Sequence, residues 1–240
     1  MAGETIEDHR DWRGFWESIG ERTSRDDHFG QVGRTVGGKP VSSEQTPLLV
    51  EAIRQALELE PSDVLLDLCC GNGLITVALA PLCRWIVAAD FSLELIDTAR
   101  ERFSAANIVY LHRAVEELEA GDFTHGAPTK VCMNGALQHF TEAGLNEVLT
   151  TIGRLRNDRL VLSFTDVPDA DRLSAFYDSP ERRAAYERRR AEGSDAMGTW
   201  WSREHLAAIM EAAGYEVSFP PHDPRRFTSH YRFDLCARAV

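Results

Sequence analysis

Residues 64–73 read VLLDLCCGNG, and this segment carries most of the information about the fold. Its first five residues are apolar except Asp67, which is typical of a strand buried on both faces of a parallel sheet. Gly71 and Gly73 follow in a tight turn, where the backbone can approach a ligand closely. A short helix is expected next, to about Leu82. A buried strand, a glycine turn and a helix together predict a nucleotide-like ligand.

Asp90 supports this prediction, because it ends the next predicted strand, residues 85–89. An acidic residue about 20 residues beyond such a turn can accept hydrogen bonds from both ribose hydroxyls. A dinucleotide-binding turn would have a third glycine at position 76, where this chain has Thr76. The carboxylate of Asp67 also lies beside the turn, and it favours a cationic ligand over a diphosphate.

Strands and helices alternate along most of the chain. Further strands are predicted at residues 108–111, 130–133, 160–164, 215–219 and 231–237. Helices are predicted after a capping box at Ser42 and Gln45, after Ser92, after Thr141 and after Ser202. This alternation predicts an α/β fold with a parallel sheet, helices on both faces and a ligand at the carboxyl ends of the strands.

Over about residues 44–240 the chain resembles class I S-adenosylmethionine (SAM)-dependent methyltransferases. The resemblance is carried by VLLDLCCGNGLIT, VAADFS, VCMNGALQHF and the closing segments WWSREHLAAIMEAAGYEV and YRFDLCAR. It implies SAM as cofactor and a Rossmann-like fold, with a seven-stranded, mostly parallel sheet of order 3-2-1-4-5-7-6.

The resemblance also implies cofactor contacts. Asp67 is expected near the methionyl amine, Asp90 at the ribose, Phe91 against adenine and Asn134 near the methionine end. The cofactor-binding candidates are Asp67, Cys69, Gly71, Asn72, Gly73, Asp90, Phe91, Val115, Glu116 and Asn134. Two positions depart from the family: Cys69 replaces the usual first glycine, and Ala114 stands where an acidic residue often contacts adenine.

His139 follows the fourth core strand and is the candidate catalytic base, because an imidazole can accept a proton near neutral pH. The alternative is a loop histidine that packs on Phe140. Gln31 and Arg34 are candidates for contacts to the methionine carboxylate. The candidates for contacts to the acceptor are Asp166, Trp200, Trp201, His222 and His230. For the two tryptophans the alternative is packing on the core, and for the last two histidines it is a surface position.

Three parts of the chain are distinguished. Residues 1–43, irregular at least to residue 41, are expected to form an N-terminal extension whose Gly-rich segment FGQVGRTVGGKP can act as a lid. Residues 44–240 are the SAM-dependent methyltransferase domain. Within it, residues 167–200 are expected to cover the substrate, and the Arg-rich run 182–190 is either a solvated helix face or a clamp for a carboxylate or phosphate.

Charge and composition narrow the partners. The net charge of −12 argues against bulk attraction to nucleic acid or to an anionic membrane. Five cysteines without a C-x-x-C pair predict reduced thiols and no metal site. The charged N-terminus lacks an apolar signal core and the chain lacks a long apolar run, which predicts a cytoplasmic protein. The sequence leaves open whether the protein is a monomer or a homodimer.

The resemblance implies an enzyme of the EC 2.1.1 class, and the polar composition of residues 167–200 favours methyl transfer to O or N of a small polar metabolite. A sugar, an amino sugar or a natural-product intermediate suits residues 167–200, which are rich in Asp, Glu and Arg. The alternatives are a methyltransferase acting on protein or RNA, and a non-catalytic SAM-binding or NAD-binding Rossmann protein.

Overall fold

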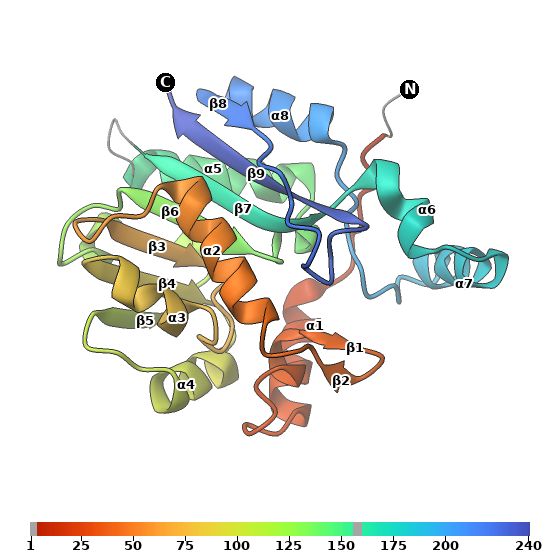
Figure 1. The fold of residues 1–240 in the computed structure, drawn as a ribbon, viewed down its shortest axis with the longest axis horizontal. Coiled ribbons are helices and arrows are strands. Elements are labelled where there is room, and N and C mark those ends of the chain that lie inside the picture. Colours follow the sequence, from red (N-terminus) through yellow and green to blue (C-terminus); the bar gives the residue numbers. More distant parts are fainter. Residues whose placement is uncertain (1–3, 156–159) are drawn as a thin grey trace.

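A computed structural model describes residues 4–155 and 160–240 of the chain. Its main feature is a seven-stranded sheet covered by helices on both faces (Figure 1). The strands are β3 (Val64–Leu68), β4 (Trp85–Asp90), β5 (Ile108–His112), β6 (Lys130–Asn134), β7 (Val161–Pro168), β8 (Tyr215–Ser218) and β9 (Arg232–Ala239). Their spatial order is β5-β4-β3-β6-β7-β9-β8, which is 3-2-1-4-5-7-6 when these strands are counted alone. The predicted topology is therefore confirmed.

The strand β3 lies at the centre of the sheet. It pairs in parallel with β4 on one side and with β6 on the other, and all five of its residues are buried. The strand β9 runs antiparallel to both β7 and β8. The carboxyl ends of β3, β4 and β6 therefore meet at one edge of the sheet, where a ligand is expected.

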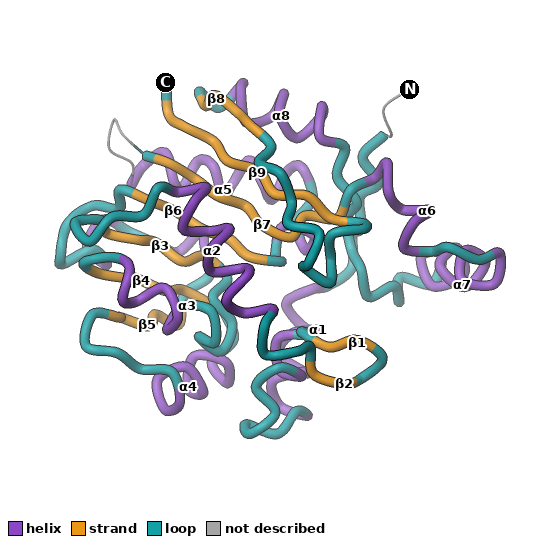
Figure 2. Tube along the Cα trace, viewed as in Figure 1, coloured by secondary structure: helices purple, strands orange, loops and turns teal. Residues whose placement is uncertain are grey.

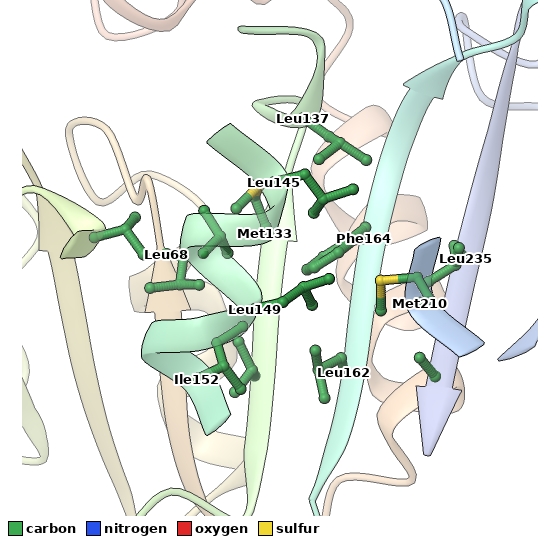
Figure 3. Packing of buried hydrophobic residues seen from close by; sticks show 14 of the residues in the cluster. Leu68, Met133, Leu137, Leu145, Leu149, Ile152, Leu162, Phe164, Met210 and Leu235 are labelled. Carbon is green, nitrogen blue, oxygen red and sulfur yellow. The ribbon is translucent and has the colours of Figure 1, made fainter. Parts of the chain in front are cut away.

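Alternate residues of β3 contribute to the two hydrophobic layers. Leu65 packs against α2 (Gln45–Leu57), α3 (Thr76–Leu79) and α4 (Leu93–Arg102). Leu66 and Leu68 belong to the opposite layer, with α5 (Glu142–Leu155) and α8 (Arg203–Ala212). Figure 3 shows this second layer, in which Leu145, Leu149 and Ile152 of α5 face the sheet.

The helix starts agree with the sequence only in part. The Ser202 side chain caps α8 by accepting a hydrogen bond from the His205 N–H, as predicted. The capping box at Ser42 is wrong, because α2 begins after Glu44 without a side-chain cap. The Gln45 amide instead accepts from the Phe227 N–H and donates to the carbonyl of residue 225, which draws it away from its own helix.

The N-terminal extension is more regular than predicted. It contains α1 (Trp12–Arg22), a 3-10 turn (Gly30–Val32) and a hairpin of β1 (Thr35–Val36) and β2 (Lys39–Pro40). Figure 2 shows α1 and this hairpin grouped together beside the start of α2. The Asp11 side chain caps α1 by accepting from the Gly14 N–H at 3.0 Å. The expectation of irregular structure up to residue 41 was therefore wrong.

The segment 167–200 begins as the end of β7 and continues through α6 (Leu173–Phe176) and α7 (Pro180–Ala191). In Figure 1 α7 projects away from the sheet. A cluster of buried aromatic side chains, Tyr177, Tyr186, Trp200 and Tyr231, packs this segment against the start of β9. Substrate covering by residues 167–200 stays a prediction. None of the helices in the described part of the chain is long and apolar enough to cross a membrane.

Candidate active site

The loop after β3 has a backbone that requires glycine at two positions. Gly71 has a φ of +58°, and a Cβ there would lie 2.8 Å from Cγ1 of Val32. Gly73 has a φ of +79°, and a Cβ there would lie 2.5 Å from the Tyr110 hydroxyl oxygen. Cys69, at the family's first glycine position, also has a positive φ of +56°, which is unfavourable for a residue with a Cβ.

The Asp90 carboxylate links this loop to the start of α4. Its Oδ2 atom accepts a hydrogen bond from the Gly71 N–H at 2.9 Å, and its Oδ1 atom accepts one from the Ser92 N–H at 2.9 Å. Burial raises the pKa of Asp90, while these N–H donors act in the opposite direction. The carboxylate is thus fixed at the carboxyl end of β4, as recognition of a ribose diol requires.

A first cavity of about 320 Å³ lies over this loop and is called the cofactor cavity below. Eight of the predicted site residues line it, namely Cys69, Gly71, Asp90, Phe91, Val115, Glu116, Asn134 and His139. Residues from four separate chain segments therefore line one cavity over the glycine loop. Gly73 lies outside this lining, and a Cβ at this position would meet Tyr110 and Ala99, so its cofactor contact stays a prediction.

Helix α1 covers the cofactor cavity, and none of its residues was among the predicted site residues. Trp12, Arg13 and Trp16 of α1 line it, and the Arg13 guanidinium lies 5.3 Å from the centre of the Phe91 ring. The buried Nε1 atom of Trp12 has no hydrogen-bond partner among the described residues. An unpartnered indole N–H, an aromatic ring and a fixed carboxylate around one cavity fit an adenosine moiety.

Asp67 is the buried carboxylate of the central strand. It accepts a hydrogen bond from the Thr76 hydroxyl at 2.6 Å and one from the Cys132 thiol at 3.3 Å. Burial raises the pKa of Asp67 to about 6, and the nearby charge of Asp90 acts in the same direction. A bound cation would offset both effects, which fits the predicted position near the methionyl amine.

A second cavity of about 710 Å³ adjoins the first and is called the acceptor cavity below. The two cavities share Trp16, Val32, Asn134 and Gly135, so they meet at the carboxyl end of β6. The lining of the acceptor cavity includes the predicted residues Asp67, Asn72, Arg34, Asp166 and His230. It also includes residues that the sequence analysis did not single out, among them Gln138, Thr228 and Arg232.

Gln31 does not line either of these cavities, so its assignment as a contact to the methionine carboxylate is not supported. Its side chain accepts from the Asn72 Nδ2 amide at 3.0 Å and donates to the Thr98 hydroxyl at 3.3 Å. Asn72 also donates to the His28 carbonyl at 2.8 Å. These bonds hold residues 28–31 against the glycine loop and α4. That the N-terminal extension acts as a lid stays a prediction.

The two tryptophans are packing residues in this structure. Trp200 and Trp201 are completely buried, and neither lines the cofactor or the acceptor cavity. The Trp201 Nε1 atom donates to the Leu137 carbonyl at 3.1 Å. Their assignment as walls of an acceptor pocket is corrected, because two large indoles gain more by filling the core.

Asp166 and His222 belong to a buried ionic network beneath the acceptor cavity. The Arg226 Nη2 atom lies 2.7 Å from Oδ1 of Asp166, and Arg226 also pairs with Asp234. Burial opposes ionisation of Asp166, but Arg226 and further donors hold its pKa below the usual value. The His222 Nε2 atom lies 3.5 Å from Asp166 and 3.6 Å from Asp234, and His222 lines neither cavity. Asp166, His222 and Asp234 are close enough to share a cation, but Arg226 already pairs with both carboxylates.

His139 lies between the rings of Trp12 and Trp16, with centroid distances of 4.2 and 5.4 Å. Burial lowers the pKa of His139 to about 3, and the charges of Arg232 and Arg10 add to this effect. The ring lines the cofactor cavity and is not part of the acceptor cavity lining. Its role as a base stays a prediction, and both its weak basicity and its position are unfavourable to that role.

Comparisons with known proteins agree with this geometry. Residues 65–158 match the family described as "Methyltransferase domain". The chain is 45% identical over 178 residues to the demethylmenaquinone methyltransferase of Mycobacterium marinum, covering 69% of this chain and 73% of that protein. It is 32% identical over 184 residues to the uncharacterized methyltransferase C70.08c of Schizosaccharomyces pombe, covering 72% of this chain and 66% of that protein.

Solved structures show the same fold at low identity. Magnesium protoporphyrin IX methyltransferase from Synechocystis with bound S-adenosylhomocysteine (SAH) has a TM-score of 0.59 and 14% identity, covering 96% of this chain and 95% of that one. A SAM-dependent methyltransferase from Aquifex aeolicus also has a TM-score of 0.59, with 16% identity, covering 83% of this chain and 94% of that one. Relatives above 30% identity over more than two thirds of the chain, together with this fold, show that the protein belongs to the class I SAM-dependent methyltransferases.

Proposed function

We propose that this methyltransferase acts on an oxygen or nitrogen atom of a small polar metabolite, such as a sugar, an amino sugar or a natural-product intermediate. The observation that carries the proposal is the acceptor cavity. Its volume of about 710 Å³ is in the range of small-molecule pockets. Its lining includes the charged side chains of Arg34, Asp166, Arg182 and Arg232. Polar groups of an acceptor can pair with such a lining, whereas a purely apolar acceptor would leave it desolvated.

The chain's own residues supply binding, alignment and exclusion of water. Bound SAM supplies an activated methyl group on its sulfonium, which is the difficult part of the chemistry. In this proposal Asp90, which lines the cofactor cavity, holds the ribose, and Asp67, which lines the adjoining acceptor cavity, holds the methionyl amine. Trp16 and Val32, from the N-terminal extension, line both cavities and so cover the junction between cofactor and acceptor. Such an arrangement favours transfer by fixing the reactants in line and excluding water.

A hydroxyl or ammonium acceptor must also lose a proton. His230 lines the acceptor cavity, whereas His139 lines the cofactor cavity. His230 is exposed and His139 is shielded by two tryptophans. We therefore place proton acceptance from such a substrate at His230 in preference to His139. The paired variants His230→Asn and His139→Asn test this, because only the first is expected to lower turnover strongly.

A quinone-like acceptor is the second candidate. Several curated relatives are named demethylmenaquinone methyltransferases, with identities from 28% to 45%. The acceptor cavity also contains the aromatic side chains of Phe15, Phe176, Phe227 and Tyr231. Against this candidate stand the buried guanidinium groups of Arg34 and Arg232, since a neutral quinone ring offers them no counter-charge.

The deciding experiment is a panel assay with methyl-labelled SAM. The purified enzyme is offered amino sugars, sugars and hydroxylated acids, and separately demethylmenaquinol, bulk RNA and a mixed protein fraction. We expect label in a polar metabolite and none in the RNA or protein arms. Label confined to demethylmenaquinol would establish the second candidate, and label confined to RNA or protein would overturn the small-molecule proposal. We also propose that the enzyme acts without a nucleic acid or membrane partner. Measuring the molar mass of the protein in solution decides between a monomer and a homodimer.

A further inference from the structure

Resting on the proposed function, we infer that the acceptor carries an anionic group, a carboxylate or a phosphate, which Arg34 and Arg232 bind together in the acceptor cavity. Both side chains line this cavity and come from segments far apart in the chain, the N-terminal extension and the start of β9. Neither has a carboxylate of its own among the described residues.

Arg34 is a buried guanidinium that lies 6.0 Å from the centre of the Phe227 ring and forms no ion pair with a carboxylate among the described residues. Only 8% of the residue is exposed, and its Nε atom has no hydrogen-bond partner among the described residues. Burial lowers the pKa of Arg34, and the charges of Arg226 and Arg232 act in the same direction. Burying an unpaired charge is costly, so it persists where a ligand completes the pairing.

Arg232 is held in place by the backbone instead of by a carboxylate. Its Nη1 atom donates to the carbonyl oxygen of Asp166, and its buried Nε atom has no partner among the described residues. The Asp166 carbonyl is available because the pairing of β7 with β9 shifts register between Phe164 and Val167, and Asp166 has a φ of +58°. A carbonyl oxygen orients the guanidinium without neutralising it.

The nearby carboxylates are already engaged. Arg226 pairs with both Asp166 and Asp234, and the Thr228 hydroxyl donates to Asp166. Three guanidinium groups, those of Arg34, Arg226 and Arg232, thus share two carboxylates, which leaves one positive charge without a counter-charge. A carboxylate or phosphate on the ligand would supply it through charge-assisted hydrogen bonds, for which guanidinium groups are well suited.

The position of the pair assigns the anion to the acceptor and not to the cofactor. The charges acting on Arg34 are those of Asp166, Arg226 and Arg232, near β7 and β9. Neighbouring strands lie about 4.8 Å apart, so β7, two strands from β3, is roughly 10 Å from it. The glycine loop and Asp90 lie at β3 and β4. Arg232, at the start of β9, therefore lies on the far side of the acceptor cavity from the glycine loop, and Arg34 reaches the same cavity from the N-terminal extension.

The test measures anion binding to the SAH-loaded protein and needs no turnover. Benzoate, benzamide and inorganic phosphate are titrated by calorimetry, because benzoate and benzamide share a shape and differ in charge. We expect saturable binding of benzoate or phosphate and none of benzamide. Tighter binding of benzoate indicates that the site takes a carboxylate, and tighter binding of inorganic phosphate indicates that it takes a phosphate. The variants Arg34→Gln and Arg232→Gln are expected to weaken anion binding about tenfold or more while the affinity for SAH stays unchanged.

Arg225→Gln is the matched control, since Arg225 is an exposed arginine paired with Asp223. Arg34→Lys keeps the charge and is expected to retain part of the anion affinity, so a folding defect of the glutamine variant does not remove the test. Equal binding of benzoate and benzamide, or no anion binding by the wild type, overturns the inference. A loss of SAH affinity in Arg34→Gln with unchanged anion binding also overturns it, by assigning Arg34 to the methionine carboxylate. Because these readouts are independent of methyl transfer, the inference can fail while the proposed function holds, and the reverse.

Discussion

The Oδ2 atom of Asp90 accepts a hydrogen bond from the Gly71 N–H at 2.9 Å, so the end of β4 is tied directly to the loop after β3. The other carboxylate oxygen accepts from the Ser92 N–H. One side chain therefore fixes both the glycine loop and the start of α4 before any ligand arrives. This preorganisation reduces the cost of ordering the site when SAM binds.

Replacing Asp90 tests this arrangement. Asp90→Ala removes the ribose acceptor and the bond to Gly71, and hydrogen bonds to a charged group contribute about 1.5–3 kcal/mol each. We expect the Kd for SAM to rise about 10- to 100-fold by calorimetry. Asp97→Ala changes a partly exposed carboxylate of α4 and is the control, which should leave the Kd unchanged. An unchanged Kd in Asp90→Ala would remove Asp90 from the cofactor site.

Gly73 is predicted to be a stability position. In Gly73→Ala the new Cβ meets the Tyr110 hydroxyl at 2.5 Å and the backbone keeps a φ of +79°, so we expect a loss of about 2–4 kcal/mol in the free energy of unfolding. Gly153→Ala is the matched control, because Gly153 lies within α5 with open space around its Cβ position. That change should stabilise the protein by about 0.5–1 kcal/mol. Urea denaturation of both variants measures the difference, and equal effects would contradict the packing described for the loop.

The affinity for SAM should depend on pH through Asp67. Burial raises its pKa to about 6, so the carboxylate is ionised above that pH and increasingly protonated below it. A cationic ligand favours the ionised form, and the Kd should therefore rise as the pH falls from about 7 to about 5. Calorimetry across this range checks the slope. Asp67→Asn should bind more weakly at neutral pH and show a flatter profile, whereas parallel profiles would exclude Asp67 as the titrating group.

His139 should contribute to acid sensitivity. Burial lowers its pKa to about 3, so between about pH 3 and 6.5 the unfolded chain binds a proton that the folded chain does not. The free energy of unfolding should therefore fall by up to about 1.4 kcal/mol per pH unit as the pH drops below 6.5.

His139→Asn should reduce this slope in urea denaturation at about pH 7 and about pH 5. The control His9→Asn changes a histidine whose side chain is 75% exposed, and it should leave the slope unchanged. The same slope in wild type and His139→Asn would show that His139 is not buried as a neutral group.

The cofactor half of the site could be predicted because its signals are local. The apolar run before Asp67, the glycines at 71 and 73 and the acid at 90 each follow from neighbouring residues, and the structure brings Asp90 and Gly71 into contact. The helix α1 was missed, because an isolated segment with Gly14 gives a weak helical signal until its aromatic residues pack over the cofactor cavity.

The acceptor half depends on contacts between distant segments. Arg232 donates to the carbonyl of Asp166 across the register shift between β7 and β9, and no local pattern marks either partner. For Trp200 and Trp201 the sequence suggested a pocket wall, because they lie between the end of β7 and α8, but both pack in the core. Their burial follows from tertiary packing that a single sequence does not display.

The most direct test of a polar acceptor beside a SAM site is an unbiased one. Wild-type enzyme and the Asp90→Ala variant are incubated with methyl-labelled SAM and a whole metabolite extract, and the products are partitioned between water and an organic solvent. The account predicts labelled product in the aqueous phase with the wild type and much less with Asp90→Ala. Label found only in the organic phase with the wild type would contradict it.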